Sequence, residues 1–301
     1  MMKEKVLVVG GTGFIGNHVL KKISPKKYSL YSISKNYLKF KKKIKGVNYL
    51  KCDISNIKEL KKKVSKKFDH IINLSGYVNH SNKKENMKCH FNGCKNLAEF
   101  FKNTKIKTFI QVGSSLEYGD QVSPQSENKK CNPKGSYGLS KYKASKFLKN
   151  FGKLYNFPYI IIRPYQIYGP NQKNNRLIPQ TIEACLKNKK FDCTDGSQKR
   201  DFLFIDDFIE LIKIILKKKK IRRETFNVGY GKPYSVKYVI NTIKFIIGSG
   251  KPQFGNKLMR KDEIFSLFPS IKKVKKKINW KPKTNFSIGI KKTIKTYARK
   301  K

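Results

Sequence analysis

The sequence predicts an α/β fold, in which a doubly wound parallel sheet carries helices on both faces and a smaller, discontinuous lobe follows. Three observations support this prediction. Short apolar runs alternate with polar, amphipathic segments through the first half of the 301-residue chain, which is the pattern of repeated βαβ units. A glycine-rich turn directly follows the first apolar run. The alternation loses its regularity after Pro164.

Six apolar runs have the length and composition of buried parallel strands, which are typically continuous and rich in β-branched residues. The first of them contains Val6-Leu7-Val8-Val9. The expected strands are residues 5–9, 28–33, 47–50, 70–74, 108–112 and 159–162, with helix-like stretches at 87–103 and 140–154. The polar stretch 171–176 is expected to be a loop.

The glycine-rich turn joins the first expected strand to a helix. Its glycines permit a tight turn and let the backbone approach a pyrophosphate at the N-terminus of that helix. Because a strand precedes it and a helix follows it, the turn predicts a Rossmann-type dinucleotide site. The residues expected to contact the dinucleotide here are Gly10, Gly13, Phe14, Ile15 and Gly16.

The residues at the end of the second expected strand bear on the choice of dinucleotide. An acid at this place would bind the 2′-hydroxyl of NAD, but the chain has Ser34-Lys35-Asn36. A hydroxyl and a cation suit a 2′-phosphate, so we expect NADP, with NAD as the alternative. Lys35 could equally be one more surface lysine. Asp53, after the third strand, is a candidate partner for the adenine amino group, or it simply begins a turn.

We expect two domains. A Rossmann-type NAD(P)-binding domain should comprise residues 1–165 together with about 202–229. A smaller substrate lobe should comprise about 166–201 and 230–301. The second lobe is inferred from the irregular stretch 248–268, which mixes glycine, proline and charge.

Composition limits the other possibilities. No apolar run approaches the roughly 18 residues that a membrane span needs, and the first ten residues lack the features of a signal peptide. We therefore expect a soluble cytoplasmic protein. The six cysteines form no Cys-x-x-Cys pair and only four histidines accompany them, so neither a metal site nor a disulfide framework is expected.

The formal net charge of +50 raises the question of nucleic-acid binding. Lysine supplies 62 of the 69 basic residues, and arginine, the preferred bidentate reader of phosphates and guanine edges, supplies only seven. The lysines are spread along the whole chain. This pattern indicates compositional drift rather than a specific nucleic-acid site, although weak, salt-sensitive binding to polyanions would follow from the charge.

A tyrosine and a lysine four residues apart on one helix face suit acid–base catalysis at a carbonyl or carbinol, because the cation favours the phenolate. The spacing alone is weak evidence in this lysine-rich chain. It occurs five times, at Tyr31/Lys35, Tyr37/Lys41, Tyr137/Lys141, Tyr142/Lys146 and Tyr297/Lys301. Tyr137 and Tyr142 both lie between a strand end that offers a serine, Ser114, and the Arg163-Pro164 pair, but Tyr142 lacks the Gly-Leu-Ser context that separates Tyr137 from Lys141.

An ordered set of motifs covers nearly the whole chain and resembles the extended short-chain dehydrogenase/reductases, specifically the nucleotide-sugar epimerase, dehydratase and ketoreductase group. In chain order the motifs are the glycine turn, Asp53-Ile54, Asn73-Leu74-Ser75-Gly76, Ser114-Ser115-Leu116-Glu117-Tyr118-Gly119, Tyr137 to Lys141, Arg163 to Pro170, Arg200-Asp201-Phe202, and Phe226-Asn227-Val228-Gly229.

The resemblance implies roles for individual residues. Ser114 matches the hydroxyl that binds the reacting oxygen, Tyr137 the acid/base, and Lys141 the residue that holds the nicotinamide ribose and tunes the phenol. Arg200 and Arg260 resemble a clamp on the substrate diphosphate, for which paired guanidinium groups are well suited. The remaining implied contacts are Ile54, Leu74, Ser75, Gly76 and Pro164 to the cofactor, and Ser115 and Gln166 to the substrate.

The chain departs from the resembled pattern at three places. His90 stands where an asparagine is common, and Gln166 adds a methylene to an amide that often contacts the sugar or phosphate. Ser115 and Leu116 stand where 4,6-dehydratases carry an Asp-Glu pair, which argues against dehydratase activity.

Two enzymatic hypotheses remain open. In the preferred one, a 4-ketoreductase transfers hydride from NADPH to C4 of a nucleotide-linked 4-keto-6-deoxy sugar, and Tyr137 donates the proton. The alternative is a nucleotide-sugar 4-epimerase with tightly bound NAD, which oxidises C4 and returns the hydride to the opposite face. A third, non-enzymatic hypothesis is a polyanion-binding protein that keeps the fold, against which the complete set of Ser114, Tyr137 and Lys141 argues.

The resemblance also implies a homodimer, formed through the two long helices that flank the sheet. Five apolar positions on the helix after Tyr137 offer a surface for such an interface: Tyr142, Ala144, Phe147, Leu148 and Phe151.

Overall fold

The computed structural model describes residues 3–36, 43–77, 82–218, 220–260 and 263–298. These residues cluster into two compact units. Unit 1 comprises Met1–Gln121, Glu127–Pro164 and Ile209–Phe226, and unit 2 comprises Val122–Ser126, Tyr165–Phe208 and Asn227–Lys301. The short segment Val122–Ser126, within the range expected for the first domain, clusters with unit 2.

Unit 1 is built around a seven-stranded sheet with the order β10-β6-β5-β4-β1-β2-β3. The six strands from β6 to β3 pair in parallel, as expected. Their bounds are β1 Glu4–Val9, β2 Tyr28–Ser34, β3 Val47–Lys51, β4 His70–Asn73, β5 Thr108–Val112, β6 Tyr159–Pro164 and β10 Glu224–Val228. The chain reverses its direction across the sheet between β1 and β4, which makes the sheet doubly wound.

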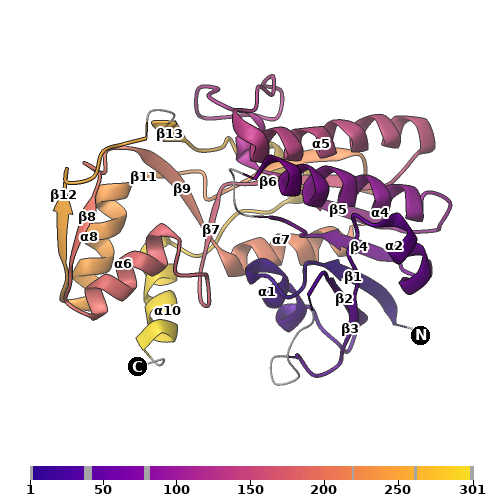
Figure 1. The fold of residues 1–301 in the computed structure, drawn as a ribbon, viewed down its shortest axis with the longest axis horizontal. Helices are drawn as coiled ribbons and strands as arrows, with labels where there is room; N and C mark the ends of the chain where they lie inside the picture. Colours follow the sequence, from indigo (N-terminus) through magenta and orange to yellow (C-terminus); the bar gives the residue numbers. More distant parts are fainter. Residues whose placement is uncertain (1–2, 37–42, 78–81, 219, 261–262, 299–301) are drawn as a thin grey trace. The chain divides into compact units, whose positions relative to one another are not determined.

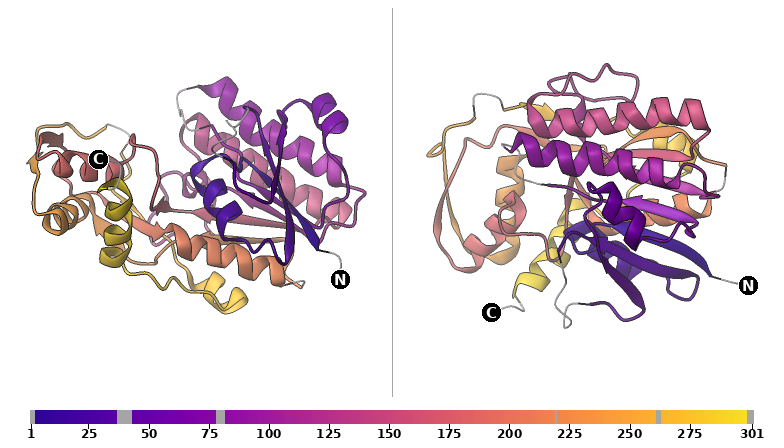
Figure 2. Two further views of the ribbon diagram at one scale, coloured as in Figure 1. Left: turned by 90° about the horizontal axis from the view of Figure 1, so that it is seen from below. Right: turned by 45° about the vertical axis from the view of Figure 1, so that its right-hand side comes forward.

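Helices cover both faces of this sheet. α2 (Ile57–Lys63), α4 (Gly93–Phe101) and α5 (Gly135–Tyr155) lie on one face, and α1 (Phe14–Lys22) and α7 (Ile205–Lys217) lie on the other (Figure 1, Figure 2). The core beneath α4 and α5 joins alternate strand residues to the apolar sides of both helices, and includes Leu7, Ile71, Phe109, Leu97, Phe101 and Leu148. Burial of both sheet faces explains why the strands read as continuous apolar runs.

The two expected helices differ from the observed ones. The stretch predicted as 87–103 is a continuous run of α3 (Lys83–Asn86), a π-helical segment η2 (Met87–Asn92) and α4. The helix predicted to begin at residue 140 begins at Gly135, so Tyr137 lies within its first turn. Gly135 and Ser136 have weak helical propensity, but contacts with other parts of unit 1, such as the hydrogen bond from Asn86 to Ser136, stabilise a helix there.

The five apolar positions proposed for a dimer interface are largely used inside unit 1. Ala144, Leu148 and Phe151 belong to the core beneath α5, and Phe147 packs against it. This part of the argument for an interface was therefore wrong, because the side chains face the chain's own sheet. The homodimer itself stays a prediction.

The described residues of unit 2 form two small sheets and four helices that lie wholly within it. β9 (Lys199–Phe204) pairs with β7 (Gln166–Tyr168), β11 (Pro233–Ser235) and β13 (Ser266–Leu267), and β8 (Lys190–Cys193) pairs with β12 (Lys251–Phe254). The helices are α6 (Leu177–Leu186), α8 (Val236–Ile247), α9 (Lys272–Ile278) and α10 (Phe286–Ala298). Rings of Tyr168, Phe202, Phe204 and Phe286 pack together at its centre. Residues 171–176 form the expected loop.

Within the part of the chain that is described, no helix has both the length and the apolar character that crossing a membrane requires.

Candidate active site

The glycine-rich turn after β1 packs tightly against its neighbours. Gly10 has a φ of +80°, and a Cβ there would lie 3.0 Å from the backbone of Leu74. A Cβ on Gly16 would lie 2.3 Å from the carbonyl oxygen of Gly10, so α1 can approach the turn only because residue 16 is glycine. Gly13 is the N-cap of α1, and the first turn of that helix has no acidic residue and no side-chain cap. Phe14 and Ile15 begin the helix.

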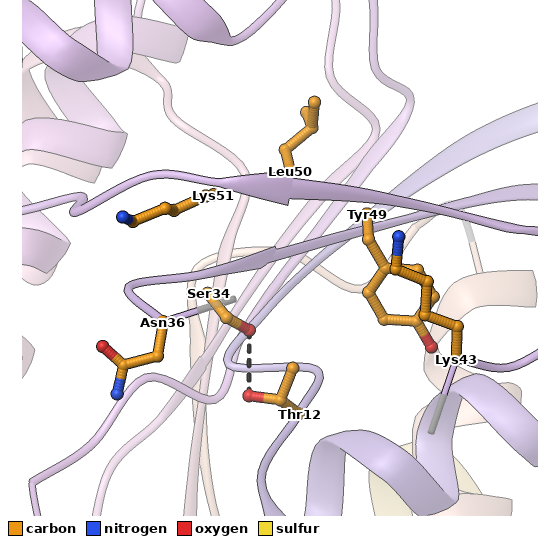
Figure 3. A pocket seen from close by; sticks show the side chains of 7 residues that line it. All are labelled: Thr12, Ser34, Asn36, Lys43, Tyr49, Leu50 and Lys51. Atoms are coloured by element: carbon orange, nitrogen blue, oxygen red, sulfur yellow. Dashed lines mark hydrogen bonds between the residues drawn. The ribbon is translucent and has the colours of Figure 1, made fainter. Parts of the chain in front are cut away.

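A small pocket of about 20 Å³ lies at the end of β2 (Figure 3). The hydroxyls of Thr12 and Ser34 are 3.0 Å apart and hydrogen-bonded at its edge. The side chains that line it are Thr12, Ser34, Asn36, Lys43, Tyr49, Leu50 and Lys51, a set that contains two lysines and no carboxylate.

Lys35, which was expected to face a 2′-phosphate together with Ser34, is engaged elsewhere. Its ammonium lies 3.7 Å from a carboxylate oxygen of Asp53 and 3.6 Å from one of Glu85, and it does not line the pocket. Asp53 accepts hydrogen bonds from the backbone and the hydroxyl of Ser55, at 3.0 Å and 2.6 Å. This is the turn that the sequence left open as an alternative for Asp53. Ile54 is buried against Gly93.

The loop after β4 is fixed by its own polar side chains. The Asn73 side chain accepts hydrogen bonds from the hydroxyl and the backbone of Ser75, at 2.6 Å and 3.1 Å. The Leu74 backbone continues the sheet by donating to the Val9 carbonyl at 2.9 Å. As a result the carbonyl of Ser75 and the Cα of Gly76 hold defined positions beside the first half of α5 and η2.

Ser114 begins a short 3₁₀ turn, Ser115–Glu117, at the end of β5. The Ser114 hydroxyl accepts from the backbone of Leu116 at 3.1 Å, and the Glu117 carboxylate accepts from the backbone of Ser114 at 2.9 Å. This reciprocal arrangement is a capping box. Ser115, expected to face substrate, is 4% exposed.

Glu117 is itself held by a buried arginine. The other carboxylate oxygen of Glu117 lies 2.9 Å from Nε and 2.8 Å from an Nη of Arg163, and both side chains are essentially inaccessible. Burial by itself lowers the pKa of Arg163, but the charge of Glu117 outweighs it and raises that pKa above its ordinary value. Arg163 therefore keeps its charge, and the pair fixes the backbone at Ser114 and at the end of β6, where Pro164 follows.

Tyr137 and Lys141 lie one turn apart on α5, with the Lys141 ammonium 6.0 Å from the centroid of the Tyr137 ring. Lys141 is 4% exposed and donates to the Val112 carbonyl at 2.9 Å and towards the Ser75 carbonyl at 3.5 Å. A Cβ at Gly138 would lie 2.6 Å from the Leu116 carbonyl oxygen. The glycine thus lets α5 approach the turn that carries Ser114.

Burial lowers the pKa of Lys141 to about 8, and the charge of Glu117 opposes this effect. Because water reaches the Lys141 ammonium so poorly, the loss of its two carbonyl contacts would leave a buried charge unsatisfied, which is energetically costly. Its position beside Tyr137 is therefore defined by backbone atoms of β5 and of the loop after β4 rather than by flexible side chains.

Unit 2 contains a cavity of about 630 Å³, and Gln166, Arg200 and Arg260 all line it. Arg200 forms an ion pair with Glu263 and donates to the Lys199 carbonyl at 2.7 Å. The Nε of Arg260 lies 3.7 Å from the other oxygen of Glu263. Burial lowers the pKa of Arg200, and Glu263 counteracts the shift. The two arginines expected to clamp a diphosphate are thus brought together around one carboxylate.

Three features of the site were not predicted from the sequence. Glu263 was not recognised as the partner of both arginines, although its spacing from Arg260 suits a local ion pair. Lys43 and Lys51, which line the pocket at the end of β2, were not distinguished from the other lysines of the chain. The pairing of Glu117 with Arg163 could have been suspected from the sequence. Each is a charged residue shortly after an apolar strand, and a charged side chain that is buried there needs a partner of opposite charge.

Comparisons with known proteins identify the family of the chain. Residues 6–229 match the model of the NAD dependent epimerase/dehydratase family. A protein of Methanocaldococcus jannaschii, provisionally named UDP-glucose 4-epimerase, is 29% identical over 96% of this chain and 97% of its own length. A dTDP-D-glucose 4,6-dehydratase of Dictyostelium discoideum is 32% identical over 75% of this chain and 58% of its own length.

Solved structures share the fold. The UDP-glucose 4-epimerase of Thermotoga maritima, solved with UDP-glucose, superposes with a TM-score of 0.90 at 23% identity, covering 98% of this chain and 99% of its own. The UDP-N-acetylglucosamine 4-epimerase of Methanobrevibacter ruminantium superposes with a TM-score of 0.88 at 22% identity over the whole of both chains. Because the family model spans well over half of the sequence, the chain belongs to the NAD-dependent epimerase/dehydratase family, whose members of the extended short-chain dehydrogenase/reductase type act on nucleotide sugars.

Proposed function

We propose that the protein is a UDP-sugar 4-epimerase that keeps its nicotinamide cofactor bound through the reaction. The observation that carries the proposal is the arrangement of Tyr137 and Lys141 on α5, with Lys141 buried and held by two backbone carbonyls. The near full-length similarity to a provisionally named UDP-glucose 4-epimerase supports the choice of reaction over the 4-ketoreductase preferred from the sequence alone.

The residues of unit 1 fit a dinucleotide. Gly10 and Gly16 let the turn, the loop after β4 and α1 pack without a Cβ between them, and the first turn of α1 carries neither an acid nor a side-chain cap that would occupy its amide groups. A helix N-terminus of this kind is suited to a pyrophosphate. The candidate contacts are Gly10, Gly13, Phe14, Ile15, Gly16, Ser34, Leu74, Ser75, Gly76, Lys141 and Pro164.

The bound cofactor would supply a hydride acceptor and, later, the hydride donor. The phenolate of Tyr137 takes the proton of the C4 hydroxyl as that carbon is oxidised, and returns it when the 4-keto group is reduced on its other face. The Ser114 hydroxyl hydrogen-bonds the reacting oxygen. Lys141 supplies the positive charge that favours the phenolate. Arg200 and Arg260 would bind the diphosphate of the substrate in the cavity of unit 2.

A Tyr137→Phe variant tests this proposal, and the chain offers a matched control in Tyr142→Phe, which also lies on α5 with a lysine four residues on. The assay follows interconversion within a panel of UDP-sugars, including UDP-glucose and UDP-N-acetylglucosamine. Tyr137→Phe should lower kcat by at least about a hundredfold through the loss of acid–base catalysis, and Tyr142→Phe should keep it. Equal activity of both variants would overturn the assignment of Tyr137.

One observation favours a second candidate, the NADPH-dependent 4-ketoreductase. The described residues that line the pocket at the end of β2 include Ser34, Lys43 and Lys51 and no carboxylate, whereas a carboxylate is the usual partner of the 2′-hydroxyl of NAD. Nucleotide released by denaturing the purified protein distinguishes the two. Stoichiometric NAD supports the epimerase. Empty protein that oxidises NADPH with a nucleotide-linked 4-keto sugar supports the reductase.

A further inference from the structure

We propose that His90 is a positioning residue, which holds Tyr137 on α5 and links it to the loop after β4. The inference rests on the proposed function only in that it takes Tyr137 to be the acid/base. His90 stands in the π-helical segment η2 and is 1% exposed. π-Helical turns inside longer helices occur frequently at functional sites.

The contacts of His90 define where its proton lies. The backbone N–H of Tyr77 donates to Nε2 of His90 at 2.9 Å, so Nε2 must carry a lone pair. In a neutral imidazole the proton is then on Nδ1, and Nδ1 lies 2.8 Å from the Ser140 hydroxyl. Ser140 accepts this hydrogen bond and donates its own proton to the Tyr137 carbonyl at 2.8 Å. Each group in the chain from Tyr77 to Tyr137 has one consistent direction of donation.

His90 also touches the Tyr137 side chain directly. The two rings meet edge to face, with centroids 5.0 Å apart and an interplanar angle of 84°, which is a favourable geometry for aromatic pairs. One helical turn earlier on both helices, the Asn86 side chain donates to the Ser136 hydroxyl at 2.9 Å. The run from α3 to η2 is therefore tied to α5 on either side of Tyr137.

These contacts also connect His90 to Lys141, the other predicted catalytic residue on α5. Tyr77 belongs to the same loop as Ser75, whose carbonyl oxygen lies 3.5 Å from the Lys141 ammonium. His90 thus binds the loop that Lys141 contacts and the tyrosine that lies beside Lys141. A shift of the imidazole would change the placement of Tyr137 relative to Lys141, even though His90 has no role in the chemistry itself.

Three substitutions separate the contacts. His90→Gln can keep a donor and an acceptor but loses the ring, His90→Phe keeps the ring but loses both hydrogen bonds, and His90→Ala loses everything. His70→Gln is the matched control, because His70 is 2% exposed, has a carboxylate partner in Glu4 at 3.3 Å, and meets the Tyr28 ring edge to face at 6.1 Å. Thermal unfolding of all four variants shows which of them fold.

The first measurement needs no substrate. Proteins labelled with ¹³C on the tyrosine rings are compared by NMR, and the Tyr137 signal is assigned with Tyr137→Phe. The His90 variants should shift or broaden the Tyr137 signal, and His70→Gln should not. The second measurement is kinetic. His90→Ala should lower kcat at least about tenfold with little change in KM, while His90→Gln retains more of kcat than His90→Ala.

The outcomes are separable from those that test the function. If no nucleotide sugar is turned over, the proposed function fails, and the NMR comparison still decides the role of His90. The proposal is overturned if the folded His90 variants leave the Tyr137 signal in place, or if they lower kcat no more than His70→Gln does. If His90→Ala does not fold, the Gln and Phe variants carry the same decision.

Discussion

In the described part of the chain, Arg163 pairs with Glu117 in unit 1 and Arg200 pairs with Glu263 in unit 2, and these two pairs differ in their surroundings. Arg163 and Glu117 in unit 1 are 1% and 0% exposed. Arg200 and Glu263 in unit 2 are 11% and 20% exposed, and both line a cavity of about 630 Å³. Glu117 also accepts from the Ser114 backbone, whereas Glu263 also meets the largely exposed Arg260.

The difference indicates two uses of the same chemistry. The buried pair has no access to a ligand, so it can act only by fixing the backbone that carries Ser114. The pair in unit 2 faces open space, so an anionic ligand can compete with Glu263 for the guanidinium groups. From the sequence, only the family resemblance distinguishes Arg200 from Arg163. In the structure, burial distinguishes them, because only the pair in unit 2 is accessible to a ligand.

The largest expected effect comes from breaking the buried pair. Glu117→Gln keeps the volume of the side chain but leaves the Arg163 charge uncompensated in the interior, which should lower the free energy of unfolding by about 3–5 kcal/mol. The matched variant Glu263→Gln, in a partly exposed pair, should change it by about 1 kcal/mol or less. Urea unfolding of both variants measures the difference. Equal losses would show that burial does not distinguish the pairs.

The second prediction concerns Lys141, which is 4% exposed and, among the described residues, has no carboxylate within ion-pair distance. Its pKa is lowered by burial to about 8, from about 10.5 in an unfolded chain. Between these values the unfolded state binds more protons than the folded state, so this group makes stability rise with pH from 8 to above 10. The full shift corresponds to about 3 kcal/mol.

The measurement compares wild-type protein with Lys141→Met at pH 7.5 and at pH 10.5. Other lysines and tyrosines titrate in both proteins and cancel in the comparison. The stability of wild type relative to the variant should increase between the two pH values. A difference that stays constant, or one that falls, would contradict the lowered pKa.

The fold could be predicted because its signals are local. All six expected strands occur, and Gly10 has a φ of +80°, which is a local requirement that glycine meets without strain. The start of α5 could not be predicted in this way. Gly135, Ser136 and Gly138 have weak helical preference, and the helix there is stabilised by partners distant in sequence, such as Asn86 with Ser136 and Leu116 against Gly138.

The candidate site shows the same difference between features that can be predicted from sequence motifs and features that depend on partners distant in sequence. Ser114, Tyr137 and Lys141 could be chosen from the order of motifs, although their roles stay proposals. The direction of the Lys35 side chain could not be chosen, because it depends on the carboxylates of Asp53 and Glu85. In a chain with 62 lysines, sequence alone does not separate a lysine that lines a pocket from one that pairs with an acid.

The smallest expected effects concern the accessible pair of Arg200 and Glu263 in unit 2. They are tested by measuring the binding of UDP by calorimetry. Arg200→Gln should weaken binding about tenfold, or about 1.4 kcal/mol, because it removes a charge-assisted contact. Arg260→Gln should weaken it less, since the Arg260 side chain is 82% exposed and its contacts are screened by solvent. Glu263→Gln should strengthen binding about twofold to threefold, because it removes the carboxylate that competes with the diphosphate. If Glu263→Gln instead weakens binding as much as Arg200→Gln does, Glu263 holds Arg200 in place for the ligand, and the two pairs share a supporting role after all.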